Sequence, residues 1–172
     1  MTTPAQFFTT RGRALKFPEQ STRHTLYVSQ PVEMTQQTDF HDDLQRLWWD
    51  EAETWPKMQA VVSGYVLEGL TGPHDDGFRS LFCRGGIQKA VALACRRAHV
   101  VAPDFGMVLD IEYTGTGARY DPSEKRPKEY CATITVVADP ANDARFFSPL
   151  GATNGRTARR AASSLAPGHS AY

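Results

Sequence analysis

The sequence predicts a mainly β domain that contains a single α-helix. Several segments alternate between apolar and polar residues with the period of two that is typical of strands. One segment, residues 86–100, instead carries an apolar stripe with the period of a helix. The chain has 172 residues, of which 41% are hydrophobic and 22% are charged, which is enough for one domain with a hydrophobic core.

Five segments have the composition and the alternation of strands. They are residues 22–35, 57–69, 78–84, 106–114 and 129–138. In the fourth of them, Leu109, Ile111 and Tyr113 alternate with more polar residues, which predicts one buried face. The first is expected to bend near Pro31, because proline cannot donate to a strand ladder. Long loops, residues 36–56 and 115–128, join the first strand to the second and the fourth to the fifth.

The helix is predicted between the third and fourth strands. Its apolar positions follow the spacing i, i+3, i+4, i+7, i+8, i+11 and are Ile87, Ala90, Val91, Ala94, Cys95 and Ala98. The resulting order, β-β-β-α-β-β, is that of an OB-fold, a five-stranded and partly open Greek-key barrel. In that fold the two long loops flank a binding face on strands two and three.

Three regions of the chain are expected to differ in order. Residues 1–20 are predicted to form an N-terminal arm anchored by one of its phenylalanines, and residues 21–138 the OB-fold domain. Residues 139–172 are predicted to form a largely disordered C-terminal tail, because they have too little apolar content to offset the entropy of ordering.

The cysteines and the N-terminal segment indicate the compartment. Cys83, Cys95 and Cys131 have neither metal-ligand nor redox spacing, and they are expected to be buried and reduced. The N-terminal segment has no continuous apolar region of the kind found in signal peptides. No apolar stretch approaches the ~20 residues that a membrane span needs. These features predict a cytoplasmic protein without membrane contact.

Motifs that would indicate an enzyme do not occur in the sequence. The tripeptide HDD appears at 41–43 and 74–76, and in both places a solvated acidic loop is favoured over a set of metal ligands. No nucleophile elbow, dinucleotide fingerprint or P-loop is present. We therefore expect a protein that is not an enzyme, with no catalytic residues, no metal and no cofactor.

Aromatic and cationic residues gather in the two long loops and on the second and third strands. Sites for single-stranded nucleic acid combine such residues, with stacking worth about 1–3 kcal/mol per base. The predicted stacking residues are Phe40, Trp48, Trp49, Trp55, Phe82, Tyr120 and Tyr130. The predicted phosphate contacts are Lys57, Arg79, Arg84, Arg119, Lys125, Arg126 and Lys128. Gln36 and Gln37 add amides that can both donate and accept hydrogen bonds.

Each of these residues could instead serve packing, and the net charge of zero gives no general attraction for nucleic acid. The first long loop also holds six acids, which argues against the whole loop lying on phosphates. The acids are Asp39, Asp42, Asp43, Asp50, Glu51 and Glu53. The case for binding therefore rests on the gathering of many candidates on two loops and one face.

Five segments between residues 20 and 138 carry a resemblance to a known family. They are QQTDF (36–40), PKMQAVV (56–62), DDGFRSLFCRGG (75–86), MVLDIEYTG (107–115) and RPKEY (126–130). In these segments the chain resembles the single-stranded-DNA-binding proteins encoded by actinobacteriophages. The resemblance implies an OB-type barrel that coats single-stranded DNA during phage replication, recombination or repair, in the host cytoplasm, with little sequence preference. It adds Gln59 to the predicted DNA contacts.

The partners expected on this reading are single-stranded DNA, further copies of the chain, and phage or host replication and recombination proteins. A homo-oligomer is expected because several barrels on one strand gain avidity. Two alternatives stay open. One is an OB-like module for protein–protein interaction, which the acidic first loop also suits. The other is an enzyme that acts on nucleotides or DNA through the HDD segments.

Overall fold

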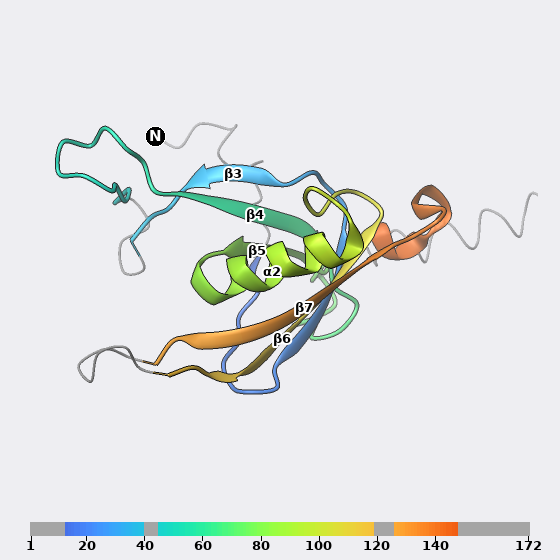
Figure 1. Cartoon of the computed structure of the whole chain (residues 1–172). Helices are drawn as coiled ribbons and strands as arrows, with labels where there is room; N and C mark the ends of the chain where they lie inside the picture. The colour runs from blue at the N-terminus through green and yellow to red at the C-terminus, as the bar shows by residue number, and fades with distance from the viewer. Residues whose placement is uncertain (1–12, 40–44, 119–125, 148–172) are drawn as a thin grey trace, which may run out of the picture.

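The computed structural model of the chain describes residues 13–39, 45–118 and 126–147 (Figure 1). The strands are β1 (Arg13–Ala14), β2 (Arg23–Val28), β3 (Glu33–Gln36), β4 (Met58–Tyr65), β5 (Phe78–Cys83), β6 (Met107–Thr116) and β7 (Lys128–Val136). Helix α2 spans Gly85–Ala98, and two short 3-10 turns, η1 (Pro140–Asn142) and η2 (Ala144–Phe146), follow β7. The prediction of a mainly β domain with one helix, placed between the third and fourth predicted strands, is confirmed for the described residues.

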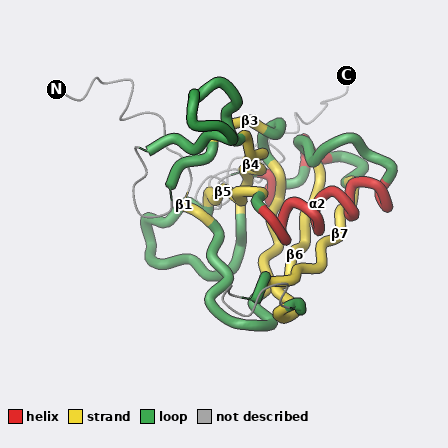
Figure 2. The backbone as a smooth tube through the Cα atoms, turned by 60° about the vertical axis from the view of Figure 1, so that its left-hand side comes forward, coloured by secondary structure: helices red, strands yellow, loops and turns green. Residues whose placement is uncertain are grey.

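The strands form one mixed sheet of seven strands in the order β1-β5-β4-β2-β6-β7, with β3 also paired to β4. Among the strands that the structure describes, only the pair of β1 and β5 is parallel, and the other pairs are antiparallel. Within the described chain β5 and β7 do not pair, so the sheet is open and does not close into the predicted barrel. Helix α2 packs mainly against β7 instead (Figure 2).

The start of α2 lies directly against β7. A Cβ atom at Gly86 would be only 2.3 Å from the carbonyl oxygen of Lys128. Real Cβ atoms do not approach backbone so closely, so this position requires glycine. Gly86 therefore allows the start of the helix to approach the backbone of β7 closely.

The first predicted strand is divided in two. Residues 29–32, which include Pro31, separate β2 from β3. Val28 of β2 is opposite Gly64 in the last part of β4, whereas Glu33 of β3 is opposite Val61 in its first part. The expected bend near Pro31 is confirmed, and its result is that both halves of the segment pair with β4.

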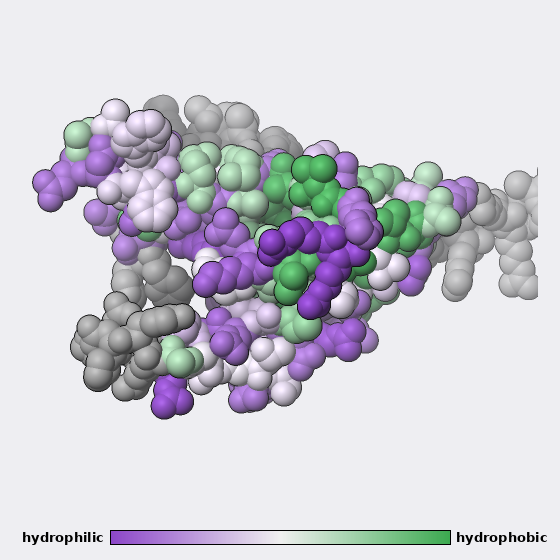
Figure 3. Space-filling view, in the orientation of Figure 1, coloured by the Kyte–Doolittle hydropathy of each residue, from purple (hydrophilic) through white to green (hydrophobic). Residues whose placement is uncertain are grey.

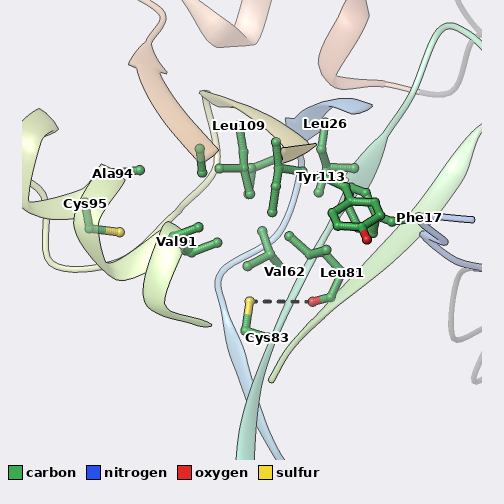
Figure 4. Close-up of a cluster of buried hydrophobic side chains, with 14 of the residues drawn as sticks. Phe17, Leu26, Val62, Leu81, Cys83, Val91, Ala94, Cys95, Leu109 and Tyr113 are labelled. Atoms are coloured by element: carbon green, nitrogen blue, oxygen red, sulfur yellow. Dashed lines mark hydrogen bonds between the residues drawn. The ribbon is translucent and has the colours of Figure 1, made fainter. Parts of the chain in front are cut away.

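The hydrophobic core lies between the sheet and α2 (Figure 4). The predicted helical stripe is confirmed, since its central members Ala90, Val91, Ala94 and Cys95 are buried. The predicted alternation in β6 is confirmed in the same way. Phe17 is buried in this core and meets Tyr130 edge to face, with ring centroids 5.1 Å apart. Phe17 is therefore the phenylalanine that anchors the described part of the N-terminal segment.

The predicted disorder of the C-terminal tail is wrong for residues 139–147. Phe146 is only 1% exposed, and its ring lies 5.7 Å from the rings of both Tyr27 and Phe105. This one aromatic residue buries enough apolar surface to order a short segment of otherwise polar composition. Residues 148–172 of the predicted tail lie outside the described residues.

The cysteines are partly as expected. All three are free thiols, and Cys83 and Cys95 are buried, but Cys131 is exposed on β7. Burial raises the pKa of Cys83 to about 12. Among the described residues no helix has both the length and the apolar character that crossing a membrane requires.

Candidate nucleic-acid interface

The loop that follows β3 has a backbone ladder of its own. Gln37 donates its backbone N–H to the carbonyl of Lys57 at 2.7 Å and accepts from the N–H of Leu47 at 2.8 Å. Lys57 in turn donates to Leu47 at 3.0 Å. Three short extended segments around these residues therefore lie side by side, and the loop extends the sheet beyond β3 and β4 (Figure 1).

The two predicted glutamines hold this loop together. The side-chain amide of Gln36 donates to the carbonyl of Leu47, and that of Gln37 donates to the carbonyl of Met58, both at 3.0 Å. Both side chains are partly buried. Their position at the end of a strand is explained by this structural role, so we leave them out of the binding surface.

The tip of the loop presents two tryptophans. Trp49 and Trp55 lie opposite each other, joined by a 2.8 Å hydrogen bond from the N–H of Trp49 to the carbonyl of Trp55. Their side chains are 73% and 69% exposed, whereas Trp48 is partly buried. Two large aromatic side chains are thus held on one short ladder and left open to solvent.

Asp50 closes the turn between these tryptophans. Its carboxylate accepts hydrogen bonds from the hydroxyl and the N–H of Thr54 and, at 2.8 Å, from the N–H of Trp55. The Thr54 hydroxyl, followed by the Trp55 N–H, lowers the pKa of Asp50 below its ordinary value. This acid of the first loop therefore supports the turn that presents the aromatic pair.

A cation lies against this pair. Lys57 precedes β4, and its ammonium nitrogen is 4.7 Å from the centroid of the Trp49 ring. Lys57, Gln59 and Val61 alternate with the other residues of β4 and so share one face of it. Val61 is opposite Phe82 of β5, and Phe82 is half-buried. The Trp49–Lys57 contact and the β4–β5 face are therefore continuous.

Arg84, at the end of β5, is positioned on this face by two neighbours. Its Nε donates to the side-chain oxygen of Gln59, and its terminal nitrogen donates to the carbonyl of Thr38 at 3.3 Å. Gln59 is itself buried and donates to the hydroxyl of Thr35 at 3.4 Å. The chain of contacts from β3 through Gln59 holds the guanidinium of Arg84 between β4 and the loop.

Two predicted residues on β7 serve packing in the described chain. The ammonium of Lys128 donates to the carbonyl of Phe17 at 2.8 Å and lies 4.7 Å over the ring of Tyr113. Tyr130 packs against Phe17 and Tyr113, and burial raises its pKa. Both side chains thus make contacts within the protein, whereas the prediction needs them available to DNA. Arg126, a third predicted contact, precedes β7 and is exposed.

Arg79 also lies elsewhere than predicted. It is buried, and its two terminal nitrogens bind the carboxylate oxygens of Asp75 at 2.9 and 2.6 Å. Asp75 further accepts from the N–H groups of Thr71 and Gly77. In the second HDD segment His74 and Asp76 are exposed, as a solvated loop requires, whereas Asp75 is buried. The Arg79 guanidinium holds the pKa of Asp75 well below its usual range. Arg79 therefore has no part in an exposed phosphate site.

Four of the predicted DNA contacts lie outside the described residues. They are Phe40, Arg119, Tyr120 and Lys125.

Two parts of the described structure project toward the same side of the molecule. They are the loop before β4 and the pair formed by the C-terminal end of β6 and the N-terminal end of β7 (Figure 1). A groove of about 530 Å³ lies between the start of α2 and this end of β6 and β7. It is lined in part by Gly85, Lys89, Leu93, Pro127 and Tyr130.

Among the described residues no group of three or more His, Cys, Asp or Glu side chains is arranged to hold a metal ion.

The structure brings together a set of five residues, which we call the aromatic face. It consists of Trp49, Trp55, Lys57, Phe82 and Arg84. Comparison of the chain with protein-family models, with curated proteins and with solved structures finds no match.

Proposed function

We propose that this protein binds single-stranded DNA on the aromatic face. The observation that carries the proposal is the contact of Lys57 with Trp49, beside a second exposed tryptophan, Trp55. Large exposed aromatic side chains held in place by a hydrogen-bonded turn need a reason other than packing. Stacking surfaces next to cations are the combination from which single-strand sites are built.

The arrangement of the strands supports an OB-type interpretation of the fold. Strand β2 lies between β4 and β6. Strand β5 lies on the other side of β4, and β7 lies on the other side of β6. We interpret this sheet as an OB barrel that is open between β5 and β7, with α2 beside the opening. In that interpretation β4 and β5 are the second and third strands, which carry the binding face of the fold.

The charges of the aromatic face indicate how a strand of DNA would lie on it. Glu51 and Glu53 are exposed at the tip of the loop and would repel phosphates there. Bases therefore stack on Trp49 and Trp55, while the sugar–phosphate backbone lies toward Lys57 and Arg84. Stacking does not depend on the identity of the base, so the proposed binding has little sequence preference.

We place this activity in the coating of single-stranded DNA during replication, recombination or repair, as the resemblance to the actinobacteriophage proteins implies. Copies bound side by side along one strand would give the homo-oligomeric assembly that was expected. Association through the DNA gains avidity even where contacts between the copies are weak.

A titration with oligo-dT at low salt tests the proposal. We expect quenching of tryptophan fluorescence, because bases would stack on Trp49 and Trp55, and we expect binding to weaken as salt rises, because displaced counterions contribute to affinity. A duplex of the same length serves as the control and should bind more weakly. If neither the fluorescence nor a gel shift responds to oligo-dT, the proposal is wrong.

A protein-interaction module is the second candidate, and one observation favours it. Phe105 and Phe147 are 40% and 45% exposed with ring centroids 6.3 Å apart, and they form an apolar patch around the buried Phe146. This candidate predicts no response to oligo-dT. It also predicts self-association that light scattering detects in the natural chain and no longer detects after Phe147→Ser.

A further inference from the structure

The outward face of helix α2 carries positive charge only. Lys89, Arg96 and Arg97 are exposed, and the fourteen residues of the helix include no Asp or Glu. These positions are spaced i, i+7 and i+8; Lys89 and Arg96 lie opposite the buried stripe that faces the core, and Arg97 lies at its border. Figure 3 shows strongly hydrophilic residues gathered over α2 on the side turned toward the viewer.

None of these three cations has a partner in the described parts of the chain. Some arginines elsewhere do have one: Arg23 pairs with Asp110 at 3.3 Å, and Arg145 pairs with Asp143 at 2.5 Å. The negative end of the helix dipole gives Arg96 and Arg97 a local reason to lie in the last turn. That reason does not extend to Lys89, which lies in the first half of the helix.

The aromatic face and the outward face of α2 meet in the chain at Arg84, which belongs to the aromatic face and immediately precedes α2. Lys89 lines the groove that Gly85, the first residue of α2, also lines. From Lys89 to Arg96 the helix rises about 10 Å, at about 1.5 Å per residue. A chain of phosphates that leaves Lys57 and Arg84 and passes the groove therefore meets further cations along the helix.

We propose that Lys89, Arg96 and Arg97 form a second phosphate-binding track, so that a long single strand runs from the aromatic face onto the outward face of α2. The inference rests on the proposed function. It adds a consequence of its own: short oligomers fill only the aromatic face, whereas longer ones also engage the helix.

The test compares two variants with the same change in charge. One is Arg96→Gln with Arg97→Gln on the helix, and the control is Lys16→Gln with Arg23→Gln, two exposed cations that are not on α2. Fluorescence anisotropy gives the affinity for labelled dT oligomers across a salt series. One oligomer has about 8 nucleotides, within the site size of about 4–16 nucleotides for one OB fold, and the other is about four times as long.

Each phosphate contact on a single strand contributes about −0.7 to the slope of log K against log salt. We expect the helix variant to reduce the steepness of that slope by about 1.4 for the long oligomer and to leave it unchanged for the short one. The variant Arg96→Lys with Arg97→Lys keeps the charge and should keep the natural slope. An effect on helix stability alone would not change the slope.

The inference fails if, on the long oligomer, both the helix variant and the control show the same slope of log K against log salt as the natural chain. The same result is expected if this face of α2 docks a protein. The inference also fails if both variants reduce the slope equally, since general charge would then explain the effect. Failure of the proposed function is recognised separately, because the natural chain would then bind neither oligomer.

Discussion

The ammonium nitrogen of Lys57 lies 4.7 Å from the centroid of the Trp49 ring, at the point where the loop enters β4. A cation–π contact at an exposed site is worth about 0.5–1 kcal/mol. Because Lys57 covers one face of the ring, a base would stack on the other face and leave the ammonium beside the sugar–phosphate backbone. The pair thus combines, within one contact, the two interactions that a single-strand site needs.

Trp49→Ala and Trp55→Ala should each weaken the binding of oligo-dT by about 1–3 kcal/mol, since each removes one stacking surface. The backbone ladder that joins the two positions does not depend on their side chains. Anisotropy titrations at constant salt measure the effect. Phe105→Ala removes a different exposed aromatic side chain and should leave the affinity unchanged; an equal loss in that variant would contradict the assignment of the aromatic face.

Phe82→Ala should weaken DNA binding more than Lys16→Ala. Phe82 lies on the β4–β5 face opposite Val61, whereas Lys16 lies in the segment that leads to β2. We expect the Phe82 variant to lose up to the value of one stacked base, about 1–3 kcal/mol. Circular dichroism confirms that each variant is folded. Equal affinities of the two folded variants would show that the face of β5 does not contact DNA.

Asp50→Ala should weaken DNA binding and leave the global stability nearly unchanged, because the carboxylate orders only the turn between Trp49 and Trp55. Asp50→Asn keeps one accepting oxygen and should restore part of the affinity. Since the pKa of Asp50 is lowered in the folded chain, the order that it supports is present above its ordinary value of 3.8 and is lost as the pH falls through the lower folded value. Near-UV circular dichroism of the tryptophans reports this change.

Asp75→Asn should be the most destabilising neutralisation of any described acid, because it leaves the buried guanidinium of Arg79 without its counter-ion. The pKa of Asp75 is also lowered on folding, so its stabilisation is present above the ordinary value of 3.8 and disappears only under strongly acidic conditions. Thermal unfolding at neutral pH measures the effect. Asp76→Asn, at the exposed neighbouring position, is the control, and a similar fall in Tm for both variants would show that the buried pair contributes nothing particular.

Phe146→Ala should lower the free energy of unfolding by about 3–5 kcal/mol, the cost of removing a fully buried aromatic side chain. Phe147→Ala, at the adjacent exposed position, should have a much smaller effect. Urea unfolding compares the two. We also expect a chain that ends after residue 147 to be more stable than one that ends after residue 138; equal stability of the two truncations would contradict the role of Phe146.

The candidate site shows where sequence patterns stop being informative. An aromatic or basic residue near a strand end has the same local pattern whether it faces solvent or a partner from a distant part of the chain. Arg79 is bound by Asp75, and Lys128 is bound by the carbonyl of Phe17, 111 residues earlier in the sequence. Trp49 and Trp55 were correctly expected to lie in the first long loop, but only the ladder between residues 37, 47 and 57 shows that they are presented together.

The sequence by itself determined the elements in which one face is buried along a regular period. The helix with its stripe from Ile87 to Ala98, and the alternation in β6, follow from local spacing that repeats every 3.6 or every two residues. Only the tertiary structure decided that the sheet stays open beside α2, that Phe146 belongs to the fold, and that Lys57 meets Trp49. These features depend on contacts between segments with no shared period, and such contacts form only when the whole chain is packed.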